Sequence, residues 1–514
     1  MLVLMLAGLV RLPFIVDPGI TGDEANMVSI ARCTTWAIIS GVALDDSNPP
    51  LFMALLRSLL LTCGERVWVW KLASTIVNLA FLAVMMGLFR RWMGSGVALT
   101  AGVLGAIHPW QVYMATEVRG YALGALFAVC AISAAERFAA TGRTRFACAW
   151  ALACAAGFWT HYSIAVVALV TGVFTLIHIR RHSSRLATWC GLGVGAVALM
   201  AVWFPRLAEQ NVQHGGGVTH LWHLAGLPVV HAAGTTFLRP GLSWTTQAAG
   251  GSAVLLVFAL PACVGAYRLW RQQRSLAIFV FALLTASVLV PMIRSAVIGS
   301  IAFSSRYTFV VHLATLLLVS YGLHSVSRHR RTAGLLGIAL LSAVSLGQFR
   351  FVYVGRSAWR TLVTVALESV GPDDALIVPN IAQAMRLRHF SGGQFPNLFV
   401  VSSDEVHPAH VLPGASWVDA YNGLRNPGEF FTESATHRLR AFTTVWCMPK
   451  QSVDDRPPGL GTNYSLNDTV LLLPGGQFGA EAPANLGQWR RAPNNDSPSP
   501  TFNDFPLPTG SSLP

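Results

Sequence analysis

The stretch WVWKLASTIVNLAFLAVMMGLF, residues 68–89, is followed directly by Arg90 and Arg91. A helix needs about 20 apolar residues to cross the hydrocarbon core of a bilayer, and this stretch supplies that length. Basic residues gather at the cytoplasmic ends of membrane spans. The stretch therefore predicts a transmembrane helix whose C-terminal end faces the cytoplasm, and the same pattern recurs along the chain.

The composition agrees with a membrane protein. Of the 514 residues, 53% are hydrophobic and only 11% are charged, and the mean hydropathy is +0.51. Soluble proteins carry about 25% charged residues. The net charge of +13 comes from short Arg clusters between apolar runs, without a basic stripe interleaved with aromatics, so a nucleic-acid partner is not expected.

Apolar runs predict about eleven spans in an all-α polytopic bundle. The spans lie near 1–16, 68–89, 95–112, 119–138, 146–163, 164–179, 186–204, 249–268, 275–293, 307–325 and 332–349. The first run lacks a basic flank and a clear cleavage site, which favours a span over a signal peptide. A basic cluster follows every second span, which places the N-terminus in the cytoplasm and the C-terminus outside the plasma (inner) membrane.

The run at 49–63 breaks this register if it crosses the membrane. It is about 15 residues long and carries Arg57 in its middle, which favours an interfacial or re-entrant helix. Residues 17–67 therefore form one outer loop within a membrane domain of residues 1–349.

Residues 350–491 are more polar than the membrane domain. We predict a small periplasmic α/β domain there, with a helix near 358–370 and strands at the short apolar segments 375–379, 397–403, 443–448 and 469–474. The tail 492–514, rich in Pro, Asn and Ser, is predicted to be disordered.

The carboxylates of the membrane half concentrate on the outer side. In the predicted topology all but Glu136 face outward. Six of them lie in the 17–67 loop, namely Asp17, Asp23, Glu24, Asp45, Asp46 and Glu65, and the other two are Glu117 and Glu209. A channel or carrier usually places ionisable groups within its spans. This distribution favours chemistry at the outer membrane surface. The cysteines lie mostly in apolar runs and form no CxxC pair, so no metal site is predicted.

Two constellations lie in the first outer loop. In GDEAN, residues 22–26, the adjacent carboxylates Asp23 and Glu24 can supply a general base and its hydrogen-bonding partner, or they can simply cap the helix that follows. In DDSNPPL, residues 45–51, Asn48 and Pro49 precede the short apolar helix, where a proline is ordinary at a helix start.

Two further constellations lie in later outer loops. Glu117 and Arg119 stand among aromatics in HPWQVYMATEVRGYAL, residues 108–123, and can form an interfacial ion pair or part of a site. Arg306 and Tyr307 end an outer loop in SSRYTF, residues 304–309. An outward Arg can bind a lipid phosphate or snorkel to headgroups.

Together these features resemble the GT-C superfamily of membrane glycosyltransferases, in the branch of the protein O-mannosyltransferases and aminoarabinose transferases. The resemblance implies a polyprenyl-phosphate sugar donor, an acceptor glycan, lipid or protein, and no cofactor. It implies that Asp23 acts as the base beside Glu24, and that the sugar is transferred with inversion. The remaining implied contacts to substrate and phosphate are Asn48, Pro49, Glu117, Arg119, Arg306 and Tyr307. The family commonly has His or Lys where this chain has Asn48.

Three other functions remain open at this stage. A lipid or polysaccharide transporter requires polar groups within the spans, which are scarce here. A ligase of the O-antigen type places its key loop late in the chain, and the histidines of 205–248 are compatible with that arrangement. A non-catalytic assembly partner uses the acidic loop only for helix capping.

Overall fold

The structure is a computed structural model that describes two parts of the chain. In the first part it describes residues 1–16, 22–32, 34–39, 49–64, 66–206, 244–298 and 309–347. In the second it describes residues 364, 366–371, 373–378, 387, 398–402, 405–408, 444–447, 464–471 and 485–491. The chain divides into two compact units, Met1–Ser357 and Ala358–Pro514.

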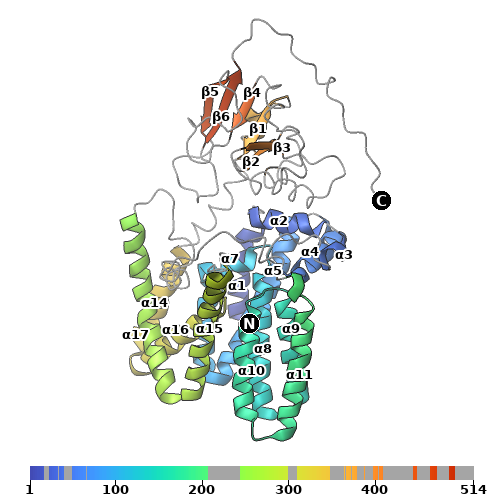
Figure 1. The fold of residues 1–514 in the computed structure, drawn as a ribbon. Coiled ribbons are helices and arrows are strands. Elements are labelled where there is room, and N and C mark those ends of the chain that lie inside the picture. The colour runs from blue at the N-terminus through green and yellow to red at the C-terminus, as the bar shows by residue number, and fades with distance from the viewer. Residues whose placement is uncertain are drawn as a thin grey trace. The chain divides into compact units, whose positions relative to one another are not determined.

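Helices make up the first unit (Figure 1). They are α1 (Leu2–Val16), α2 (Gly22–Ala31), α3 (Thr35–Ile39), α4 (Pro50–Cys63), α5 (Val67–Met93), α6 (Ser95–Ile107), α7 (Pro109–Thr116), α8 (Tyr121–Thr141), α9 (Thr144–Phe158), α10 (Ile164–Ile179), α11 (Ser183–Ala201), α14 (Trp244–Gln272), α15 (Arg274–Ile298), α16 (Phe309–His329) and α17 (Arg331–Gly347).

Several of these helices have the length and composition of membrane spans. Among the described residues, five helical segments are long and apolar enough to cross a bilayer: Val67–Met93, Tyr121–Thr141, Ser183–Ala201, Arg274–Ile293 and Phe309–Arg328. Six shorter apolar helices accompany them: α1, α4, α6, α9, α10 and α17. Large apolar side chains such as Leu9, Val194 and Leu256 are exposed on the bundle, as lipid-facing residues are. The chain is a multi-pass membrane protein, while the count of about eleven spans stays a prediction.

Small residues let the helices approach closely. The consecutive helices α8 to α11 pack side by side (Figure 1). In the α14–α16 pair, a Cβ on Gly265 would overlap the backbone carbonyl of Leu318, and one on Gly322 would overlap that of Pro261. Glycine removes this obstacle, and close backbone contact is a main source of helix association in lipid.

The predicted span 95–112 is wrong as one continuous helix, because the chain breaks at His108–Pro109 into α6 and α7. Pro109 has no N–H to donate to the carbonyl of Gly105. The fully buried Arg11 of α1 fills this gap: its Nη1 donates to Ala106 O at 2.8 Å and its Nη2 to Gly105 O at 3.4 Å. Arg11 therefore joins the first helix to the end of α6.

The second unit contains a six-stranded sheet in the order β3-β2-β1-β4-β6-β5. The strands are β1 (Ala375–Val378), β2 (Leu398–Ser402), β3 (Glu405–Pro408), β4 (Thr444–Cys447), β5 (Tyr464–Leu471) and β6 (Asn485–Arg491). β1 pairs in parallel with β2 and β4, and the other pairs are antiparallel. The four predicted strands coincide or overlap with β1, β2, β4 and β5. Residues 366–369 are helical within the predicted helix, and the predicted disordered tail lies outside the described residues.

Candidate functional site: buried charges between two loops

Five charged side chains are at least nine-tenths buried in the part of the chain that the structure describes. They are Arg11, Glu24, Lys71, Glu117 and Arg119, with exposed fractions of 0%, 0%, 0%, 0% and 7%. They come from α1, from α2 in the first predicted outer loop, from the first turns of α5, and from the connection between α7 and α8. Burying a charge is costly unless it is paired or functional. The bonds of Arg11 to the end of α6 account for its burial, so the other four residues are the candidate site.

A hydrogen bond joins the two predicted outer loops. The Oε1 atom of Glu24 accepts the buried backbone N–H of Val118 at 2.8 Å. Val118 lies between Glu117 and Arg119, so both come next to the first loop, as a shared site requires. Since this bond goes to a distant segment, the role of Glu24 extends beyond capping its own helix.

The second loop is held tightly around Arg119. Arg119 Nη1 donates to the hydroxyl of Tyr121 at 2.8 Å, and the guanidinium carbon lies 5.3 Å from the centroid of that ring. A Cβ on Gly120 would lie 3.0 Å from the carbonyl oxygen of Thr160, so this position accepts little beyond glycine. Glu117 ends α7 as its C-cap residue. These contacts fix the direction in which the loop presents its charges.

The first loop is braced by Arg57, the charge that interrupts the apolar run 49–63. Its Nη1 donates to the carbonyls of Ala31 and Arg32 at 3.2 and 3.0 Å, and its Nε donates to Thr35 Oγ1 at 3.0 Å. These carbonyls lie at the C-terminal end of α2, where a cation also favours the helix dipole. Arg57 thus fastens α4 to the helix that carries Asp23 and Glu24.

Replacing Arg57 with Leu should loosen this loop. The variant loses hydrogen bonds from a charged donor, each worth about 1.5–3 kcal/mol. We expect a thermal unfolding midpoint lowered by several degrees and faster limited proteolysis within residues 17–67. Arg66→Leu, a neighbouring arginine at the N-cap of α5, is the matched control. Equal protease resistance of Arg57→Leu and wild type would contradict the bracing role.

Pro49 and Pro50 start α4 beside the connection between α9 and α10. Pro49 is buried and is the N-cap residue of α4, with Pro50 at the first helical position. The backbone N–H of Leu51 donates to Trp159 O at 2.9 Å. The prolines therefore have a structural role at the helix start. The predicted contact of Pro49 with substrate is not tested by these bonds.

An apolar cavity of about 320 Å³ lies between α4, α5 and the second loop. Among the described residues of its lining, Arg119 alone is charged. The other described lining residues are apolar or carry a hydroxyl: Phe52, Leu55, Leu56, Ser58, Leu59, Thr62, Trp70, Ala73, Ser74, Val77, Val118, Ala122 and Leu123. The described part of the wall is thus hydrophobic, with the guanidinium of Arg119 beside it.

Two site residues were missed in the sequence. Lys71 is fully buried and stands one helical turn before Thr75, whose hydroxyl donates to Ala115 O in α7 at 3.3 Å. Residues four apart share a helix face, so Lys71 belongs to the face of α5 that meets α7. A lone lysine at the outer end of an otherwise uncharged run was the signal that could have found it.

His161, the second missed residue, lies in the connection between α9 and α10. Its Nδ1 accepts the backbone N–H of Ser163 at 3.3 Å and lies 2.6 Å from the Ser163 hydroxyl, and its ring centroid lies 5.7 Å from that of Tyr121. His161 therefore lies against Tyr121, the residue that holds Arg119.

The remaining predicted residues are described only in part or not at all. Asp23 lies in the first turn of α2, and its side chain lies outside the described residues. Asn48, Arg306 and Tyr307 also lie outside them. Within the described ranges, no group of three or more His, Cys, Asp or Glu is placed to hold a metal ion.

The chain has the fold of a solved aminoarabinose transferase, a branch that its sequence resembles. The chain is similar to ArnT from Cupriavidus metallidurans in the apo state, with a TM-score of 0.54 and 14% identity, and to the same protein bound to undecaprenyl phosphate, with a TM-score of 0.53 and 15% identity. Both alignments cover 87% of this chain and 92% of ArnT. At this identity the likeness establishes the fold.

The oligosaccharyltransferase of Archaeoglobus fulgidus is a more distant structural match. It aligns with a TM-score of 0.48 and 10% identity over 88% of this chain and 68% of its own. No family model matches the sequence, and no curated protein sequence matches it.

Proposed function

We propose that the chain is a glycosyltransferase that moves a sugar from a polyprenyl-phosphate donor to an acceptor at the outer face of the membrane. One observation carries this proposal: the Glu24–Val118 hydrogen bond brings the first loop against the second, where Arg119 lines an apolar cavity. The GT-C fold supports it, because ArnT with this fold is seen bound to undecaprenyl phosphate.

The cavity suits the lipid half of such a donor. Its apolar walls from α4 and α5 can bury isoprene units, since burying apolar surface is favourable at about 25 cal/mol per Å². Arg119 at the same cavity can pair with the phosphate through charge-assisted hydrogen bonds. A guanidinium held by Tyr121 is pre-organised for the charge that develops on the leaving phosphate.

The reaction that this arrangement supports is an inverting displacement. An acceptor hydroxyl attacks the anomeric carbon, its proton passes to Asp23, and the bond between that carbon and the phosphate oxygen breaks. The products are the glycosylated acceptor and free polyprenyl phosphate, whose charge Arg119 stabilises. Glu24 positions the loops, while Glu117 and Lys71 supply buried charge around the sugar. Arg306, Tyr307 and Asn48 complete the proposed contacts.

The proposed location follows from the distribution of arginine. With the Arg clusters in the cytoplasm, the buried charges lie at the outer side of the inner membrane, the N-terminus is cytoplasmic and the second unit is periplasmic. A lipid-linked donor in the outer leaflet and a glycan, lipid or protein acceptor can both reach this side.

A transfer assay with a panel of radiolabelled polyprenyl-phosphate sugars, in membranes that contain the protein, tests the proposal. We expect at least one donor to yield labelled product and free polyprenyl phosphate. Asp23→Asn should lower the rate by about 10²–10⁴-fold, because it removes the general base. Asp373→Asn, an exposed aspartate of the second unit, is the matched control. Transfer at the wild-type rate by a folded Asp23→Asn variant would refute the assignment of the base, and no transfer from any donor would favour the transporter or assembly-partner hypotheses.

A further inference from the structure

A second cavity, of about 340 Å³, lies at the opposite, Arg-rich end of the bundle between α5, α8, α10 and α15. Its volume falls within the range of about 300–1,000 Å³ that is typical of small-ligand pockets. It shares no lining residue with the cavity at Arg119. The proposed glycosyl transfer therefore does not account for it.

Aromatic rings form much of the wall of this cavity. The centroid of Phe279 lies 6.1 Å from that of Trp92, with the rings edge to face, and 4.8 Å from that of Phe174. Gln273 Nε2 donates to the carbonyl of Trp92 at 3.2 Å, which ties the start of α15 to the end of α5. Aromatic side chains that line one space can bind a cation over a ring face, because each ring carries negative charge on its face.

Acceptor groups line the same cavity. Glu136 contributes a carboxylate, and its Oε2 accepts a hydrogen bond from Arg91 Nε at 3.0 Å. His178 Nδ1 lies 2.8 Å from the carbonyl oxygen of Phe174. Because a carbonyl only accepts, Nδ1 is the donor in this contact. The cavity thus combines aromatic side chains with a carboxylate that can accept from an N–H donor.

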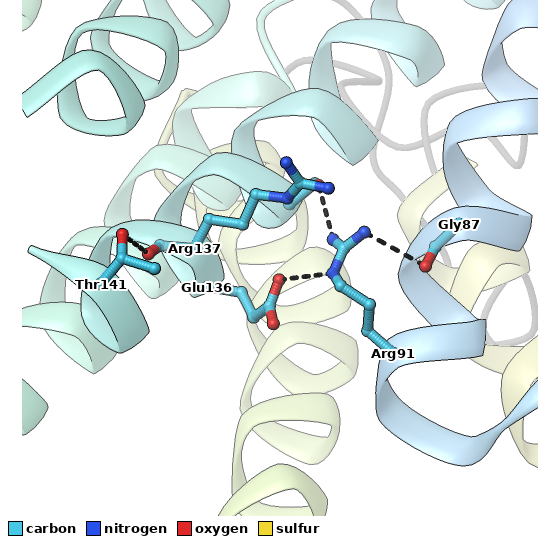
Figure 2. A network of polar contacts seen from close by, with 6 residues as sticks. Gly87, Arg91, Glu136, Arg137 and Thr141 are labelled. Atoms are coloured by element: carbon cyan, nitrogen blue, oxygen red, sulfur yellow. Dashed lines mark hydrogen bonds and ion pairs between the residues drawn. The ribbon is translucent and has the colours of Figure 1, made fainter. Parts of the chain in front are cut away.

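Arg91 is fixed beside Glu136, just outside the lining of the cavity. Its Nη1 donates to Gly87 O at 3.1 Å and its Nη2 to Ser133 Oγ at 2.7 Å, so the guanidinium is held against Glu136 (Figure 2). The same end of the bundle carries Arg90 and Arg137. An isolated cation is repelled by this surplus of positive charge. A ligand that carries a phosphate next to its ammonium group can pair with both kinds of charge: the ammonium with the carboxylate and the phosphate with the arginines.

We propose that this cavity binds the headgroup of a zwitterionic phospholipid with a primary ammonium, of the phosphatidylethanolamine type. The ammonium lies among Trp92, Phe174 and Phe279 and donates to the carboxylate of Glu136. The phosphate faces the arginines at the bundle end. The lipid then joins α5, α8, α10 and α15, and its loss leaves this end less stable.

The test uses the full-length protein, purified in detergent and stripped of lipid. Phosphatidylethanolamine, phosphatidylcholine and phosphatidylglycerol with identical acyl chains are added in turn, and the thermal unfolding midpoint and the bound lipid in native mass spectra are measured. We expect the largest stabilisation from phosphatidylethanolamine. Phosphatidylcholine should bind less well, because its quaternary ammonium donates no hydrogen bond. Phosphatidylglycerol, which lacks a cation, should bind least, and equal binding of all three lipids would overturn the proposal.

Variants locate the effect in the cavity. Phe279→Leu keeps an apolar side chain but removes a ring face, and Glu136→Gln keeps an oxygen for Arg91 but removes the charge. Each should weaken phosphatidylethanolamine binding about five-fold or more. Phe281→Leu, on the same helix but outside the lining of the cavity, should leave binding unchanged. If Phe279→Leu and Glu136→Gln both bind this lipid as wild type does, the assignment of the cavity is wrong.

Discussion

Replacing Arg119 with Gln is expected to lower the rate of sugar transfer by about 10²–10³-fold, the usual cost of removing one group that stabilises developing negative charge. Among the described residues that line the apolar cavity, Arg119 alone is charged, so no other of these side chains replaces its charge at the leaving phosphate. Its loss also leaves the Tyr121 hydroxyl without this donor. Initial rates at saturating donor, together with the KM for the donor, measure the effect.

A matched arginine separates this role from the general effect of losing a charge. Arg330 is exposed between α16 and α17. The variant Arg330→Gln should therefore transfer sugar at the wild-type rate. Arg119→Gln loses the bond to Tyr121, so its thermal unfolding midpoint should fall, and the rates are compared at a temperature at which both proteins are folded. A folded Arg119→Gln variant with wild-type kcat and donor KM would show that Arg119 does not act on the phosphate.

Removing the carboxylate of Glu24 should damage stability and transfer together. In Glu24→Ala the buried N–H of Val118 loses its acceptor, which costs about 1–3 kcal/mol. The two loops then lose their direct connection, and misplacement of a site by about 1 Å can cost about 10²-fold in rate. We expect a lower unfolding midpoint and a transfer rate lowered by about that factor.

The conservative substitution distinguishes the hydrogen bond from the charge. Glu24→Gln keeps an oxygen that can accept the Val118 N–H, so its unfolding midpoint should lie between those of wild type and Glu24→Ala. Glu368→Ala, at an exposed glutamate of the second unit, controls for loss of a carboxylate elsewhere. If Glu24→Ala has the unfolding midpoint and the sugar-transfer rate of wild type, the hydrogen bond between the loops contributes to neither stability nor activity.

The helices could be predicted from the length of the apolar runs. Much of the site could not, because it is formed by contacts between residues that are far apart in the sequence. Apolar length placed most helices close to their observed bounds, and the charge of Arg57 marked α4 as unusual. The break at Pro109 could have been read from the sequence, because proline ends the hydrogen-bond ladder. The hydrogen bonds by which Arg11 satisfies the freed carbonyls could not be predicted, because Arg11 and these carbonyls are about 95 residues apart in the chain.

The pairing of Glu24 with Val118 shows the same limit, because it spans 94 residues. The charged residues of both loops could be found in the sequence. Nothing in the sequence indicated that the two loops contact each other. Lys71 was overlooked because a lysine near a span end is ordinary, and only its complete burial marks it out. In the second unit, β3 and β6 were missed because polar residues such as His407 and Gln488 interrupt their apolar pattern.

The most direct test of the central claim is photo-crosslinking of the purified protein with a polyprenyl phosphate that carries a diazirine on its first isoprene units. We expect labelled peptides from α4 and the first turns of α5. We also expect undecaprenyl phosphate, but not uncharged polyprenol, to suppress the labelling. Both the labelling and its suppression should be weaker in Arg119→Gln. Labelling confined to other helices, or suppressed equally by polyprenol and by undecaprenyl phosphate, would contradict the central claim.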